Sequence, residues 1–245
     1  MNDKLTLAQR LVVAADFKPD GSNVMNSIEH QVLSLADLLS ETGVCLKVNS
    51  ALRICGYRLI DEIHSRGLQV FADLKLNDIR ETLLTDGILL RETNPELLTV
   101  VCSTGVAAMK ALKAQLPDTE VLGVTVLTSL ADGDTNGIYA CSTEEAVMRL
   151  VKVAADAKIN GLVLSPKEID MVRERFGETL SFNTPAVRPK WAVVNGDDQN
   201  QARVMTPEMA IRAGARRIIV GRPITQAKNP NQATMRTIEE ISLAV

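Results

Sequence analysis

Three ionisable side chains stand in the segment VFADLKLNDIRET, residues 70–82, where an apolar run gives way to charge. Asp73 and Lys75 are two residues apart, so on a β-strand their side chains point to the same face. Asp78 follows three residues later. Burying charged groups costs free energy unless opposite charges accompany them. The spacing therefore predicts a paired carboxylate and ammonium at a strand end, where a fixed ammonium can stabilise developing negative charge and supply a proton.

Two further charged residues stand at the ends of neighbouring apolar segments. Lys47 lies near the end of GVCLKVN (43–49), and Asp16 ends LVVAAD (11–16). We expect Lys47 to reach the space around Asp73, so that lysines and aspartates alternate and each charge is flanked by its opposite. A rim of surface salt bridges around a loop is the alternative. The entry of several charges from adjacent segments favours a reactive cluster.

A second polar constellation follows a late apolar run, in IIVGRPIT (218–225). Gly221 permits close approach of a ligand to the backbone, and Arg222 offers a planar fork for an oxyanion. Both features are typical of a phosphate site. Alternatively, Arg222 caps a helix or pairs with an acid. The preceding polar loop, residues 186–205, is long enough to close over a phosphate as a lid. Its candidate phosphate contacts are Arg188, Gln199, Gln201 and Arg203.

The elements that must position these residues alternate along the chain. Short apolar runs predict strands at 11–16, 43–49, 69–75, 97–102, 121–128, 161–165, 180–185 and 216–222. Helical spacing follows them at 25–42, 51–67, 81–94, 105–116, 143–158, 166–177, 206–214 and 229–245. Eight strand–helix units predict an α/β fold, a (β/α)₈ barrel, forming a single domain over residues 1–245. An open doubly wound sheet is the alternative, and the absence of G-x-G-x-x-G after the first strand disfavours it. Barrels place their active sites at the carboxyl ends of the strands, where the charged residues fall.

The composition restricts the partners of the chain. It has 245 residues, 46% of them hydrophobic, and a formal net charge of −3, which gives no long-range attraction for nucleic acid or an anionic membrane. No apolar window is long enough to cross a bilayer, and the N-terminus lacks the apolar core of a signal peptide. Four scattered cysteines predict reduced thiols in a cytoplasmic protein. The two histidines have no neighbouring ligands in sequence, so no metal site is expected.

Several of these motifs together resemble the bacterial orotidine 5′-phosphate decarboxylases. The segment DLKLNDI matches the D-x-K-x-x-D signature of that family, and the resemblance runs from about residue 11 to the C-terminus. The signature alone is shared with a sister family of sugar-phosphate decarboxylases and aldolases, so the joint set carries the resemblance. The other matching segments are LKV (46–48), VTVLTS (124–129), TPAVRP (184–189), QARVMTP (201–207) and VGRPIT (220–225).

The resemblance implies cofactor-free decarboxylation of orotidine 5′-monophosphate to uridine 5′-monophosphate by a homodimer. It implies that Lys75 protonates C6 of the pyrimidine, that Asp73 faces the substrate carboxylate, and that Lys47 and Asp16 lie at the ribose hydroxyls. Asp78, counted with the catalytic residues, would enter the site of the other subunit. The remaining substrate contacts that it implies are Ile79, Thr82, Thr128, Pro185, Arg188, Gln201 (with Gln199 as a competitor), Gly221 and Arg222.

Three positions depart from the family pattern. Asn49 and Ala186 replace glycines, and Cys102 stands where histidine is frequent. Alanine at position 186 is unfavourable if that backbone requires a positive φ.

Three rival functions stay open at this point. One is a Mg²⁺-dependent sugar-phosphate decarboxylase of the same superfamily, which Lys47 disfavours because an acidic metal ligand stands there in those relatives. The others are a non-catalytic nucleotide-binding homologue and a generic phosphate-binding barrel isomerase. Neither accounts for the paired lysines and aspartates.

Overall fold

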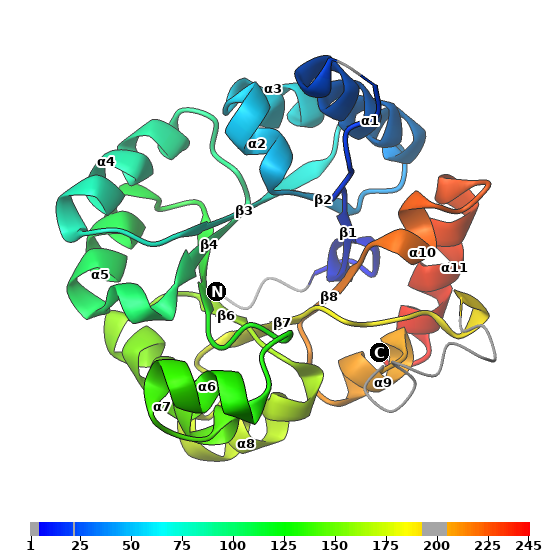
Figure 1. The fold of residues 1–245 in the computed structure, drawn as a ribbon. Coiled ribbons are helices and arrows are strands. Elements are labelled where there is room, and N and C mark those ends of the chain that lie inside the picture. Colours follow the sequence, from blue (N-terminus) through cyan, green and yellow to red (C-terminus); the bar gives the residue numbers. More distant parts are fainter. Residues whose placement is uncertain (1–4, 22, 193–204) are drawn as a thin grey trace. The chain divides into compact units, whose positions relative to one another are not determined.

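The structure, a computed structural model, describes residues 5–21, 23–192 and 205–245. Its strands follow chain order from β1 to β8 in a closed parallel barrel. Helices alternate with the strands along the chain, as the colour gradient shows (Figure 1). The predicted (β/α)₈ barrel is confirmed, because an open doubly wound sheet would have two edge strands and a reversal of strand order.

The strands are β1 (Leu11–Ala14), β2 (Cys45–Val48), β3 (Gln69–Leu76), β4 (Leu97–Val101), β5 (Glu120–Val124), β6 (Gly161–Val163), β7 (Ser181–Thr184) and β8 (Arg217–Val220). The α-helices are α1 (Val24–Leu39), α2 (Ser50–Cys55), α3 (Arg58–His64), α4 (Arg80–Arg91), α5 (Val106–Gln115), α6 (Asp132–Tyr139), α7 (Thr143–Ala157), α8 (Ile169–Phe176), α9 (Pro207–Arg212), α10 (Arg222–Thr225) and α11 (Pro230–Ser242). Short 3₁₀ helices are η1 (Ala8–Arg10), η2 (Cys102–Thr104), η3 (Pro166–Glu168) and η4 (Lys190–Ala192).

Most strands end earlier than predicted, so several site candidates lie beyond the strand ends. β1 ends at Ala14, so Asp16 follows the strand. β5 ends at Val124, so Thr128 lies in the loop beyond it and not at the strand end. β8 ends at Val220, and Arg222 is the first residue of a short helix that the sequence patterns did not predict.

The chain folds into two compact units. The first comprises residues 1–72 and 184–245, of which 5–21, 23–72, 184–192 and 205–245 are described. Within it β1 pairs in parallel with both β2 and β8, with Val13 in register with Leu46 and Val220. Asn23 caps the start of helix α1, because its side chain accepts a hydrogen bond from the Asn26 amide. Its buried residues recur at helical spacing and form its apolar face: Ile28, Val32, Leu35, Ala36 and Leu39.

The second unit comprises residues 73–183. Within it β4, β5, β6 and β7 pair in sequence order, with Thr99 of β4 in register with Leu122 of β5. Helices α4 and α5 approach closely at Gly87, where a Cβ atom would lie 2.9 Å from Cβ of Gln115. Glycine therefore permits this helix pair to pack.

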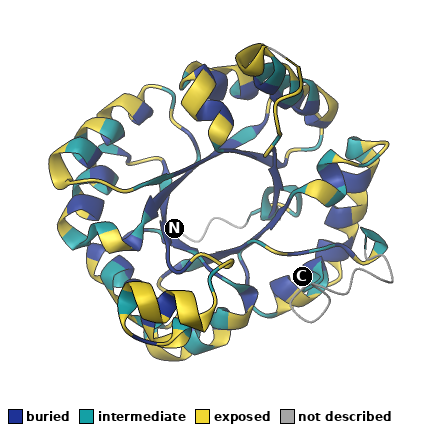
Figure 2. Cartoon of the chain, viewed as in Figure 1, coloured by how far each residue is buried: buried dark blue, intermediate teal, exposed yellow. Residues whose placement is uncertain are grey.

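Burial follows the pattern expected for parallel strands covered on both faces. Strands β1, β2 and β8 are buried at every position, whereas the helices carry both buried and exposed residues (Figure 2). All four cysteines lie among the described residues as buried thiols, as predicted. No described helix combines the length and apolarity that a bilayer-spanning segment requires.

Candidate active site

The first unit holds a carboxylate–ammonium pair at the carboxyl ends of β1 and β2. The Nζ atom of Lys47 donates to both carboxylate oxygens of Asp16, at 2.9 and 2.8 Å. The backbone fixes this approach, because Lys47 is in register with Ala14 and its carbonyl accepts a hydrogen bond from the Ala15 amide at 2.9 Å. The Lys47 side chain is 8% exposed and that of Asp16 is 54% exposed. The pair therefore joins a buried ammonium to a carboxylate that a ligand hydroxyl can reach.

The second unit holds the pair predicted from DLKLND. The Nζ atom of Lys75 donates to Oδ2 of Asp73 at 2.7 Å, as the two-residue spacing predicts. The Asp73 side chain is 9% exposed, whereas that of Lys75 is 31% exposed. The carboxylate is thus nearly buried and charge-paired, whereas its lysine partner is partly accessible.

The backbone of Lys75 lies in the left-handed region, with φ of +49° inside β3. This conformation is uncommon for a residue with a Cβ atom and costs free energy, and such residues cluster at functional sites. The segment that follows is exposed. Asp78 accepts a hydrogen bond from the Ile79 amide at 2.7 Å, and Ile79 is 70% exposed.

Thr82 lies half-buried in the first turn of α4. Further along the same helix, burial raises the pKa of the Asp86 carboxyl, and the nearby charge of Asp78 raises it further.

The candidate phosphate contacts follow β7 and β8 in the first unit. Gly221 directly follows β8, and Arg222 is exposed at the start of α10. A Cβ atom at Gly221 would meet only ordinary contacts with Ala14, the nearest atom being 3.6 Å away, so protein packing does not itself require glycine. Arg188 is half-buried, and its amide donates to the Met205 carbonyl at 3.0 Å. This bond joins the two ends of the loop.

The remaining predicted contacts follow two other strands. Pro185 directly follows β7, and Thr128 is exposed in the loop after β5. Gln201 and its competitor Gln199 lie outside the described residues.

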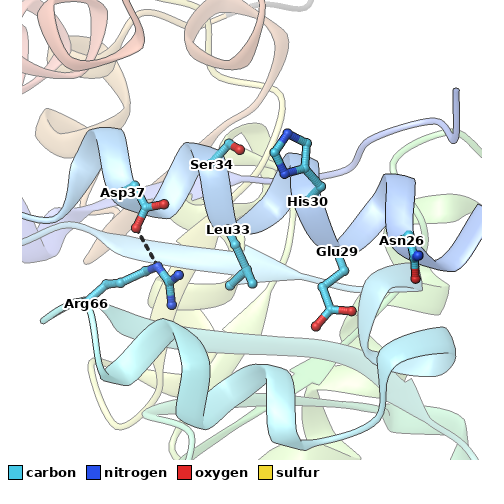
Figure 3. Close-up of a pocket in the computed structure, with 7 residues that line it drawn as sticks. All are labelled: Asn26, Glu29, His30, Leu33, Ser34, Asp37 and Arg66. Atoms are coloured by element: carbon cyan, nitrogen blue, oxygen red, sulfur yellow. Dashed lines mark hydrogen bonds and ion pairs between the residues drawn. The ribbon is translucent and has the colours of Figure 1, made fainter.

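A polar pocket of about 370 Å³ lies elsewhere in the first unit, on the surface of α1. Its lining residues are Asn26, Glu29, His30, Leu33, Ser34, Asp37 and Arg66 (Figure 3). Arg66 is paired with Asp37 at 2.6 Å, and Glu29 is paired with Arg58 at 2.7 Å. None of the predicted site residues lines it, and its charges are satisfied as surface ion pairs. Within residues 5–21, 23–192 and 205–245, no three His, Cys, Asp or Glu side chains gather to hold a metal ion.

The family model described as "Orotidine 5′-phosphate decarboxylase / HUMPS family" matches residues 9–237. This chain belongs to that family. An orotidine 5′-phosphate decarboxylase of Saccharophagus degradans is 34% identical over 95% of this chain and 93% of its own length. The corresponding protein of Alkalilimnicola ehrlichii is 36% identical over 95% of this chain and 96% of its own length. The crystal structure of the Lactobacillus acidophilus protein of the same name has a TM-score of 0.75 and 26% identity, covering 95% of this chain and 99% of its own.

The three departures from the pattern of the decarboxylase family have different local consequences. Ala186 has φ of +61°, so an alanine occupies the left-handed conformation that glycine tolerates. The Oδ1 atom of Asn49 is buried without a hydrogen-bond partner among the described residues. Burial raises the pKa of the Cys102 thiol to about 12, so this cysteine is an inert packing group and not a nucleophile.

Two threonines of the second unit contact the family signature and were missed by the sequence patterns. Thr99 of β4 bonds to both Asp73 and Lys75, and the hydroxyl of Thr104 donates to Oδ1 of Asn77 at 2.9 Å. The signal for Thr99 was a single hydroxyl in the otherwise apolar run LLTVV (97–101). Because threonine is common in strands, that signal did not distinguish it.

Proposed function

We propose that this chain decarboxylates orotidine 5′-monophosphate to uridine 5′-monophosphate in de novo pyrimidine biosynthesis, without a cofactor or metal. The observation that carries the proposal is the ion pair of Asp73 and Lys75 within the family signature, with Nζ of the lysine 2.7 Å from the carboxylate. Membership of the decarboxylase family and the names of the relatives support the same substrate.

Each step of the reaction has a matching group. When the C6–carboxylate bond breaks, CO₂ leaves and the electron pair stays on C6 of the pyrimidine. In our proposal the Lys75 ammonium stabilises this charge and then gives its proton to C6, which forms the C6–H bond of the product. Asp73 faces the departing carboxylate, and its nearly dry carboxylate repels the ground state more than the transition state. A carbanion that is stabilised by a fixed ammonium requires no organic electron sink.

We assign Lys47 and Asp16 to the ribose hydroxyls. The exposed carboxylate of Asp16 can accept hydrogen bonds from a sugar while Lys47 holds it.

We assign the phosphate to Arg188, Gly221, Arg222 and Gln201, and the pyrimidine to Thr128, with Pro185 as a further substrate contact. Arginine forks suit phosphate oxygens, and binding energy from a distant phosphate can hold the reactive arrangement. The positions of Gly221 and Arg222 directly after β8 support this assignment.

We further propose that the active form is a cytoplasmic homodimer of chains that each fold as one domain over residues 1–245. Asp78, Ile79 and Thr82 would contact the site of the other subunit, with Asp78 completing the charge array. The exposure of Asp78 and Ile79, at 70% for Ile79, makes both side chains accessible to a second subunit.

The test is the loss of orotidine 5′-monophosphate absorbance on addition of purified protein, run with and without EDTA. We expect equal turnover in both arms and uridine 5′-monophosphate as product. Binding of uridine 5′-monophosphate without turnover would instead identify a non-catalytic homologue. Activity abolished by EDTA and restored by Mg²⁺ would identify a metal-dependent relative.

A further inference from the structure

Thr99 contacts both residues of the Asp73–Lys75 pair and is completely buried. Its Oγ1 atom is 3.0 Å from Oδ1 of Asp73 and 2.9 Å from the backbone nitrogen of Lys75. One hydroxyl group therefore bonds to both residues of the pair, through the side chain of the first and the main chain of the second.

The chemistry of the two partners fixes the direction of both bonds. An ionised carboxylate only accepts hydrogen bonds, and a backbone N–H only donates, so the hydroxyl donates to Asp73 and accepts from Lys75. The oxygen of Asp73 that Thr99 contacts is not the one that contacts Lys75 Nζ. The two contacts therefore fix the rotation of the carboxylate about its last side-chain bond.

Thr99 also contacts the main chain at Lys75, whose backbone conformation is uncommon. Its hydroxyl accepts a hydrogen bond from the Lys75 amide, and Lys75 has φ of +49°. A left-handed residue within a strand persists only when its surroundings hold it. Strand pairing fixes the backbone of Thr99, which is in register with Leu122 on β5. Its β-branched side chain is stiff, so the hydroxyl that holds Lys75 is fixed as well.

We propose that Thr99 is a positioning residue for decarboxylation: its hydroxyl orients the Asp73 carboxylate and holds the Lys75 backbone so that the ammonium is aimed at the reacting carbon. The residue does not touch substrate and acts through the pair. This inference rests on the proposed function for its kinetic consequence, whereas its structural consequence can be measured independently.

The decisive variants are Thr99→Val, which removes the hydroxyl at nearly constant shape, and Thr99→Ser, which retains it. We expect Thr99→Val to lower kcat by about 10- to 100-fold, since small displacements of reacting groups have effects of this size. The affinity for uridine 5′-monophosphate should stay within about threefold, because the phosphate contacts are unchanged. Thr99→Ser should recover most of the lost kcat.

The matched control is Thr119→Val in the same unit. Thr119 is also buried, and its hydroxyl donates to the Pro95 carbonyl at 2.8 Å, before the amino end of β5. Its loss removes one buried hydrogen bond away from the reactive pair. Thr119→Val should therefore lower the melting temperature as Thr99→Val does while leaving kcat unchanged. Equal loss of kcat in both variants would reduce Thr99 to a structural role and overturn the inference.

A second measurement does not depend on the reaction. Amide hydrogen exchange at Lys75 should be slow in the wild type and in Thr99→Ser, and faster in Thr99→Val but not in Thr119→Val. If the wild type left orotidine 5′-monophosphate unchanged, the proposed function would fail, and exchange would still decide whether Thr99 holds Lys75. Unchanged exchange in Thr99→Val, or an unchanged kcat in an active enzyme, contradicts the proposal.

Discussion

At the scale of single residues, Lys75 combines two features that disfavour folding. Its backbone is left-handed, and its side chain is only 31% exposed beside a nearly buried carboxylate. A left-handed non-glycine residue costs about 1–3 kcal/mol, and a partly desolvated ion pair gains little net stability. A residue chosen for stability alone would have neither feature. The free-energy cost of Lys75 therefore indicates that this residue serves a reaction and not stability.

Removal of the Lys75 ammonium should abolish turnover while nucleotide binding persists. We expect Lys75→Ala to lower kcat more than about 10³-fold, because the variant loses both charge stabilisation and the proton donor. Steady-state kinetics and calorimetric titration with uridine 5′-monophosphate measure the two effects separately. Lys152→Ala, which removes an exposed lysine paired with Asp156 on α7, is the control and should retain full activity. Near-normal turnover of Lys75→Ala would refute the assigned role.

The backbone at Ala186 gives a prediction about stability. Because its φ is +61°, Ala186→Gly should raise the free energy of unfolding by about 0.5–1 kcal/mol, the left-handed penalty less the entropy that glycine loses on folding. Ala155→Gly, the same change inside α7, should lower it by a similar amount. Urea denaturation measures both variants. Destabilisation by both changes would show that position 186 does not need glycine-like freedom.

The sequence predicted the Asp73–Lys75 pair because a two-residue spacing on a strand determines which side chains meet. It also placed Lys47 and Asp16 among the reactive residues, but not their direct ion pair. That contact depends on the register of β1 against β2, which residue spacing within one segment does not contain. Thr99 escaped prediction for a similar reason, since its importance lies in a neighbouring strand.

At the scale of elements, apolar runs and helical spacing predicted all eight strands and the main helices. Two errors have clear physical causes. The predicted helix 51–67 is divided into α2 and α3 at Gly56, whose φ of +75° ends the first helix. Helix α6 lies outside the predicted helices, because DGDTNGIY has two glycines and little apolar periodicity. Polar contacts hold it instead, including the Asp134 carboxylate, which accepts a hydrogen bond from the Ala131 amide.

Glu168, in the 3₁₀ helix η3 after β6, should make the protein less stable as the pH rises. Burial raises the pKa of Glu168 to about 7, against an ordinary value of 4.5. Between these values the folded chain retains a proton that the unfolded chain releases, so this group lowers stability progressively from about pH 4.5 to 7. Glutamine keeps the acceptor for the Ser165 amide and removes the charge.

We therefore expect Glu168→Gln to stabilise the protein at pH 8 by about 1–2 kcal/mol, less than the full shift implies because the side chain is partly exposed. The gain should vanish below about pH 4.5, where both states of the wild type hold the proton. Urea denaturation at both pH values measures it, with the exposed Glu178→Gln as control. A gain that does not depend on pH would argue against a buried carboxyl with a raised pKa.

At the scale of the whole molecule, the barrel and the family are established, whereas the single domain and the dimer remain predictions. A single chain shows which of its residues are exposed, and the residues that contact a second subunit are to be sought among these. Asp78 and Ile79 are the strongest, because a carboxylate counted with the catalytic residues stands beside an exposed isoleucine. The question is whether Asp78 serves its own subunit or the other one.

Mixed dimers of two inactive variants answer this question. If Asp78 acts across the interface, Lys75→Ala and Asp78→Ala are each inactive alone, because every site lacks one essential group. In a mixed dimer, one site takes Lys75 from one subunit and Asp78 from the other and is intact, while the second site lacks both. Co-refolding equal amounts should give about a quarter of wild-type activity, since half of the dimers are mixed and each has one working site. If Asp78 acts within its own subunit, every site keeps one defect, and the mixture stays as inactive as its components.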